Sequence, residues 1–144
     1  MDPNKLLTPV ALRIMGDATL KSLTTDPVRV VKGKNKGGKG NPCFTVDVLT
    51  APIDEDFKAI NGTIQVKIYL DDYASGNPNI ETMGPVLERL MELFDDKPLT
   101  VSGYLNYSLW AQEPLGPLPE TLPGGEISGE HFGVVRIGYG LIRN

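Results

Sequence analysis

Three stretches in the second half of the chain alternate apolar and polar residues, and a fourth repeats apolar residues at helical spacing. The alternating stretches are residues 63–70, 99–109 and 135–141. Alternation with a period of two is typical of a strand that buries one face, so each stretch predicts a strand. Their expected inward residues are Ile64, Val66, Ile68 and Leu70, then Leu99, Val101, Leu105, Tyr107 and Leu109, and finally Val135, Ile137, Tyr139 and Leu141.

The helical stretch follows the acidic turn DDYASGNPN. With Asn79 as N-cap, Pro85 would lie inside the helix, where proline removes a hydrogen bond and clashes with the preceding turn. We therefore expect a turn followed by a helix from about Pro85 to Phe94, with a kinked first turn over residues 80–83 as the alternative. Its apolar stripe, which should pack on the apolar face of the sheet, consists of Ile80, Met83, Leu87, Leu90, Met91 and Phe94.

The N-terminal residues predict a helix that can divide into two. Thr8 and Pro9 have the residue types of an N-cap and a first helical position. Gly16-Asp17 can end this helix and start a second one, with Asp17 as its cap and an end near Leu23. The residues expected to share the buried face are Leu7, Ala11, Ile14 and Ala18.

Two short strands and two connections complete the predicted order of elements. Residues 28–31 and 44–48 are the strand candidates, because each is short, apolar and bounded by turn residues. Residues 51–62 predict an acidic connection. Residues 112–131 hold four prolines and four glycines, so we expect a long irregular loop there.

Length and composition indicate one globular domain over residues 1–144. The chain is 22% charged and 40% hydrophobic, and no apolar run is long enough to span a bilayer. The predicted fold class is α+β, a mixed and mostly antiparallel sheet with about two helices on one face and extended loops at 32–42 and 112–131. Cys43 is the single cysteine, which excludes an internal disulfide. The net charge of −4 argues against nucleic-acid binding over the whole surface.

The segment GKNKGGKG, residues 33–40, comes within one residue of a Walker A phosphate-binding loop. Two physical requirements fail. Gly40 stands where a hydroxyl should bind magnesium, and Asn41-Pro42 follows where a helix should begin. We therefore interpret the segment as a flexible basic hairpin tip, which can still bind an acidic partner electrostatically.

Other candidate chemistry is weak. The acidic pairs 71–72 and 95–96 and the cluster 54–56 lack the ligand spacing of a calcium loop, so no metal or cofactor is expected. Asp72 and Asn79 more simply shape a turn and cap a helix. A nucleophilic pair of Cys43 with His131, the single histidine, stays open because such pairs form in space. No enzymatic activity is predicted.

The order of elements resembles the tail terminator, or tail completion, proteins of long, non-contractile-tailed bacteriophages and prophages. The likeness runs from about Leu6 to Ile142 and rests on IMGDATLKSL, PVRVV, PCFTVDV, TIQVKIYLDD and VLERLMELF followed by two closing strands. It implies a small subunit that forms a ring, usually of six, which caps the head-proximal end of the tail tube. It also implies contacts with the tube protein and the head connector, DNA passing through the ring without specific binding, no membrane contact, and location in the virion after assembly in the host cytoplasm.

A head-to-tail ring needs two different complementary surfaces on each subunit. Loops, strand edges and opposite charges can supply them, so we expect the lysine-rich loop to face a neighbouring subunit or another protein. The residues expected to contact such partners are Lys34, Lys36, Lys39, Asp71, Asp72, Trp110, Glu113, Glu120, Glu126 and Glu130. Two alternatives stay open: a neck or head-completion protein, and a nucleotide- or nucleic-acid-binding module that uses the lysine-glycine loop.

Overall fold

The computed structural model describes residues 2–50, 59–121 and 127–144. Within them, one curled sheet of seven strands is ordered β1-β2-β3-β7-β5-β4, and β6 pairs with β7. The strands are β1 (Val30–Lys32), β2 (Cys43–Thr50), β3 (Ala59–Asp71), β4 (Thr100–Val101), β5 (Tyr104–Ala111), β6 (Leu115–Thr121) and β7 (Ile127–Arg143). The helices are α1 (Asn4–Met15), α2 (Ala18–Leu23) and α3 (Ile80–Phe94). Only the β1–β2 pair is parallel, which confirms the expected mixed α+β class.

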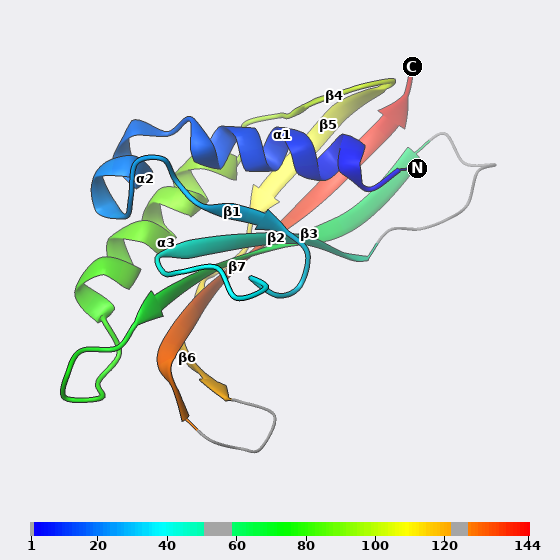
Figure 1. The fold of residues 1–144 in the computed structure, drawn as a ribbon. Helices are drawn as coiled ribbons and strands as arrows, with labels where there is room; N and C mark the ends of the chain where they lie inside the picture. The colour runs from blue at the N-terminus through cyan, green and yellow to red at the C-terminus, as the bar shows by residue number, and fades with distance from the viewer. Residues whose placement is uncertain (1, 51–58, 122–126) are drawn as a thin grey trace.

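The centre of the sheet is the antiparallel pair of β3 and β7, which are in register from Ala59 opposite Ile142 to Asp71 opposite Glu130. The predicted inward residues of both strands are buried. They face the helices, which cover one side of the sheet (Figure 1). The alternation in both stretches is therefore confirmed, because each strand has one face in the core and one face outside it.

Helix α1 packs against strands from both edges of the sheet. It contacts β1 and β2 at one edge and β4 at the other (Figure 1). It begins at Asn4 rather than at Thr8, so Pro9 lies inside the helix. Leu6 and Val10 are fully buried, and this burial outweighs the hydrogen bond that Pro9 cannot donate. Asp17 caps α2 as expected, accepting a hydrogen bond from the Leu20 N–H at 3.0 Å, whereas Ala18 is exposed instead of buried.

Helix α3 begins at Ile80, so the expected start near Pro85 is wrong. Asn79 is the N-cap: its Oδ1 accepts hydrogen bonds from the Thr82 N–H at 3.1 Å and the Tyr73 hydroxyl at 2.7 Å. Met83, in the first turn, is almost fully buried. The cap and this burial hold a regular turn ahead of Pro85, whose ring is exposed.

The stretch 99–109 forms a hairpin, β4 and β5, rather than one strand. Gly103 makes the turn with a φ of 82°, a backbone angle that favours glycine. A register shift between Asn106 and Ser108 then breaks the alternation. As a result Leu105 and Tyr107 are exposed, contrary to expectation, and Asn106 is buried, with its amide donating to the Ser108 and Gly140 carbonyls.

The expected loop 112–131 is wrong, because most of its described residues form β6 and the start of β7. Pro117 and Pro119 lie on β6, which has no partner on its other side in the described sheet. Prolines lack an N–H and are tolerated on such an edge strand. The expected connection 51–62 is also shorter than predicted, since β3 begins at Ala59, and residues 51–58 lie outside the described residues.

Candidate interaction surfaces

The lysine-glycine loop, residues 33–42, joins two parallel strands, so it is not the hairpin tip that the sequence suggested. After β1 the chain runs back to the level at which β1 began, and it enters β2 directly at Cys43. A phosphate-binding loop instead leads into a helix N-terminus, whose N–H groups hold the anion. The loop therefore lacks the helix that follows a Walker A motif, as the sequence indicated.

The loop is fixed to the far end of β3 and β7 by a polar cluster that we call the loop clamp: Lys36, Asn41, Asp71 and Glu130. Lys36 forms an ion pair with Glu130, and its Nζ donates to Asn41 Oδ1 at 2.8 Å. The Asn41 amide donates to Asp71 Oδ1 at 2.9 Å and to Glu130 Oε2 at 2.5 Å. The clamp uses Lys36 internally and leaves Lys34 and Lys39 exposed.

Removing the clamp should loosen the loop without unfolding the protein. We expect Glu130→Ala to raise amide hydrogen exchange over residues 33–40 about tenfold, because a half-buried ion pair and hydrogen bond stabilise the closed loop by about 1–2 kcal/mol. Glu113→Ala is the matched control, since Glu113 is an exposed carboxylate outside the clamp. Equal exchange in the two variants would show that Glu130 does not hold the loop.

Cys43 and His131 lie on opposite faces of the sheet. Cys43 is in register with Tyr69, and His131 with Leu70, the next residue of β3, whose side chain points the other way. Cys43 is fully buried, and burial raises the pKa of its thiol. His131 Nδ1 donates to Asp72 Oδ1 at 2.5 Å. The nucleophilic pair is therefore not formed.

The acidic pairs have structural contacts of their own. Asp95 Oδ1 accepts a hydrogen bond from the Ala111 N–H at 3.0 Å, and Asp71 belongs to the loop clamp. No group of three or more Asp, Glu, His or Cys side chains that could hold a metal ion occurs in the described ranges. Likewise, none of the helices there is long and apolar enough to cross a membrane.

A groove lies along the free edge of β1, and we call it the β1-edge groove. Its volume is about 470 Å³, and its walls combine apolar and basic side chains. Met15, at the end of α1, is 41% exposed there. The Arg29 guanidinium donates to the carbonyls of Gly40 and Asn41, which places its charge beside that of Lys39. The lining residues are Met15, Pro27, Val28, Arg29, Val30, Val31, Lys39 and Gly40.

The face of β5, β6 and β7 that points away from the helices carries several large exposed apolar side chains, with the exposed Arg136 among them. Trp110 and Tyr107 lie on it above Gly138 and Gly140, where any Cβ atom would come within 2.0 Å and 2.5 Å of the two rings. The Tyr107 hydroxyl donates to Asn61 Oδ1 at 2.6 Å. We call this surface the outer apolar face; its large exposed residues are Leu105, Tyr107, Trp110, Leu115, Leu118 and Ile142.

Two predicted acidic residues flank this face. Glu113 is exposed between Trp110 and Leu115, and Glu120 is half-buried near the end of β6. Trp110 is opposite Gly138 of β7, whereas Pro119, the neighbour of Glu120, is opposite His131, so the structure does not bring Trp110 and Glu120 together. Glu120 lies instead near Tyr69, whose ring Lys36 of the lysine-glycine loop covers. Glu126 lies outside the described residues.

Sequence reasoning missed the apolar members of the face and the basic Arg29. The missed residues of the face are Leu105, Tyr107, Leu115, Leu118 and Ile142. The spacing of Leu115 and Leu118 among prolines reads as a loop, and Leu105 follows a turn that reverses its orientation. The signal that was available is the paired glycines of GYG, 138–140, because glycine within a strand often marks a place where another group approaches the backbone.

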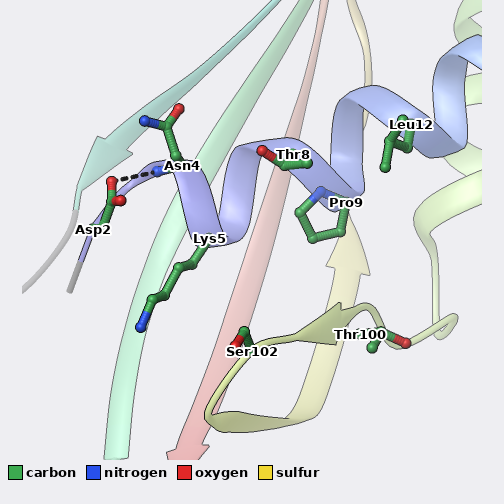
Figure 2. Close-up of a pocket in the computed structure, with 8 residues that line it drawn as sticks. All are labelled: Asp2, Asn4, Lys5, Thr8, Pro9, Leu12, Thr100 and Ser102. Carbon is green, nitrogen blue, oxygen red and sulfur yellow. Dashed lines mark hydrogen bonds between the residues drawn. The ribbon is translucent and has the colours of Figure 1, made fainter.

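A second groove, of about 490 Å³, lies between α1 and β4 (Figure 2). One wall is the helix from Asn4 to Leu12, and Thr100 and Ser102 form the other. Leu12 is 60% exposed beside it. This groove is close to electrically neutral, since Asp2 and Lys5 lie on the same wall.

Comparison with known proteins identifies the fold but no family. No protein-family model matches the chain, and no curated protein matches it. Among solved structures, a chain from the virion of a native gene transfer agent particle is similar over 95% of this chain and 94% of its own, with a TM-score of 0.67 and 12% sequence identity. A second solved chain is similar over 100% of this chain and 98% of its own, with a TM-score of 0.60 and 13% identity. At these identities the likeness establishes a shared fold.

Proposed function

We propose that this protein is a structural protein of a phage-like virion, and specifically a tail terminator. In this role it forms a ring at the head-proximal end of the tail tube, stops tube growth and joins the tail to the head connector. The observation that carries the proposal is the fold shared, over nearly the full length of both chains, with a component of a gene transfer agent virion. The order of elements that resembles tail terminators supports the finer assignment.

The arrangement of surfaces agrees with a ring subunit. The helices fill one side of the sheet, and Cys43 and His131 lie on opposite faces of it. Exposed apolar and charged residues occur together on two different surfaces, the β1-edge groove and the outer apolar face. A ring subunit needs two such surfaces, because it contacts a different surface of its neighbour on each side. DNA would pass through such a ring without specific contacts, and the tube protein and connector would bind its two rims.

Electron microscopy of the protein mixed with assembled tail tubes tests the proposal. We expect ring-shaped density, six-fold in symmetry, at one end of each tube, because a terminator recognises the growing end and not the tube wall. Tubes incubated with the protein should also stop elongating when more tube protein is added.

Three other results would contradict this assignment. Bare tube ends would remove the terminator function. Density on head connectors alone would indicate a neck or head-completion protein instead. Salt-sensitive DNA binding by the isolated subunit would favour the nucleic-acid-binding alternative.

A further inference from the structure

We propose that the lysine-glycine loop is a flap, which opens when the loop clamp breaks and uncovers an apolar patch on β2, β3 and β7. The patch consists of Cys43, Tyr69 and Phe132, and we call it the covered patch. This movement belongs to the single subunit, so it does not depend on the proposed ring function.

The covered patch lies on the side of the sheet that points away from the helices. Cys43 is opposite Tyr69 in the β2–β3 pair, and Tyr69 is opposite Phe132 in the β3–β7 pair, so the three side chains share one face. Ile68 and Leu70, the neighbours of Tyr69 in β3, belong to the hydrophobic core, whereas Cys43 and Tyr69 do not. The centres of the Tyr69 and Phe132 rings are 5.5 Å apart. The patch is therefore a second, smaller apolar cluster, separated from the core by the sheet.

The lysine-glycine loop lies over this patch. The helices cover the other side of the sheet, yet Cys43 is 0% exposed and Tyr69 is 3% exposed. The Lys36 ammonium lies 5.5 Å from the centre of the Tyr69 ring. The Asn41 amide donates to Asp71, which is two residues beyond Tyr69 in β3 and so lies on the same face. These contacts place the loop across the outside of β2 and β3.

Polar contacts hold the loop in this position. None of residues 33–42 is buried, so the loop has no apolar anchor of its own. Its backbone is bonded to the strands at its two ends, where the Gly33 N–H donates to the Val46 carbonyl and the Phe44 N–H donates to the Arg29 carbonyl, both at 2.8 Å. Between these ends, the described contacts with the sheet are those of the loop clamp and the hydrogen bonds from the Arg29 guanidinium. A segment with so few buried contacts opens at a lower free energy than the whole fold.

Opening of the flap exposes charge and apolar surface together. It separates the Lys36 ammonium from the Glu130 carboxylate, and it removes the cover from Cys43 and Tyr69. Phe132, at the edge of the covered patch, is opposite Leu118 of the outer apolar face. The open state therefore extends the outer apolar face toward β2, with a free cation and a free carboxylate beside the added surface.

Cys43 reports the opening directly, because it is the single cysteine and is buried under the closed flap. The rate of its reaction with N-ethylmaleimide, a small uncharged reagent, follows the population of the open flap. Asn41→Ala removes the amide that joins Lys36 to both carboxylates of the clamp, and it changes no charge. We expect this variant to react about tenfold faster than the native protein.

Asn35→Ala is the matched control, since Asn35 is an exposed asparagine of the same loop outside the clamp. Its rate should stay within about twofold of the native rate. If Asn41→Ala reacts no faster than this control, the clamp does not keep the flap closed and the proposal is wrong.

Lys36→Gln separates opening of the flap from a change in the reactivity of the thiol. Burial raises the pKa of the Cys43 thiol, and the cations of Lys36, Arg29 and Lys39 oppose this rise. Loss of the Lys36 charge by itself would leave less thiolate and slow the reaction. The flap predicts the opposite sign, a reaction about tenfold faster, because the ion pair with Glu130 is lost. A slower reaction would contradict the proposal.

Urea distinguishes opening of the flap from unfolding of the whole protein. Opening of a short loop exposes little surface, so the labelling rates of the native protein and of Asn41→Ala should be nearly independent of urea below the unfolding transition. Circular dichroism of the same samples locates that transition. Rates that rise steeply from the lowest urea concentrations, in parallel with unfolding, would mean that Cys43 reacts only in the unfolded chain and would rule out the flap.

Discussion

Phe94→Ala is expected to lower the free energy of unfolding by about 3–5 kcal/mol, because truncation of a buried phenylalanine removes its packing and leaves a cavity. Phe94 is fully buried at the end of α3. The Arg13 guanidinium lies 5.4 Å from the centre of its ring and donates to the carbonyls of Leu93, at 3.0 Å, and Pro98, at 2.8 Å. The ring therefore supports the contact through which α1 supplies a cation to the C-terminus of α3, which has no basic residue in its own last turn.

Urea unfolding followed by circular dichroism measures this loss. Ile80→Ala is the matched control, since Ile80 belongs to the same helix but is 59% exposed. We expect this control to change the free energy of unfolding by less than about 0.5 kcal/mol. A loss in Phe94→Ala as small as that in the control would mean that the end of α3 is not part of the cooperative core.

Asp17→Ala is expected to cost about 2–4 kcal/mol, because it removes a helix cap and leaves Arg89 without its main partner. Asp17 accepts hydrogen bonds from Arg89 Nη2 at 2.6 Å and from Arg89 Nε at 3.0 Å, and it also caps α2. One side chain thus joins α2 to α3. Asp17→Asn, which keeps a capping oxygen but not the charge, should lose less, about 1–2 kcal/mol.

The contribution of Asp17 should depend on pH. The hydrogen bonds from Arg89 hold the pKa of the Asp17 carboxyl below its ordinary value, against the opposing effect of burial. A carboxyl with a lowered folded-state pKa stabilises the fold above its unfolded-state pKa, about 3.9, and loses this contribution as the pH falls through the folded-state value. The difference in unfolding free energy between the native protein and Asp17→Asn should therefore be full at pH 7 and shrink below about pH 4. A difference that stays constant down to pH 2 would contradict the ion pair.

The central strands could be predicted from the sequence because their alternation reports directly on burial. In β3 and β7, every second residue faces the helices over a long, unbroken register. In β4 and β5 the same pattern misled, since the turn at Gly103 and the register shift after Asn106 change which residues face inward. Local spacing cannot reveal such a shift, because the partner strand determines it.

The candidate surfaces, too, could be predicted only in part from the sequence. The lysine-rich loop and the acidic residues Glu113 and Glu120 were recognisable as unpaired charge in the sequence. The ion pair that holds Lys36 could not be predicted, because Glu130 is distant in the chain and reaches the loop only through the register of β3 and β7. The start of α3 was missed for a related reason: the burial of Met83 depends on the sheet beneath it.

We expect the prolines of β6 to disfavour fibril growth. An exposed apolar strand with a free edge normally invites other copies to add to it by backbone hydrogen bonding, and the resulting polymer does not close. Pro117 and Pro119 have no N–H to offer, which weakens β6 as a template for a further strand. Contacts at this strand then depend more on the fit of side chains than on backbone hydrogen bonds. The chain should therefore stay dispersed at high concentration, where a strand of similar hydropathy without prolines would aggregate.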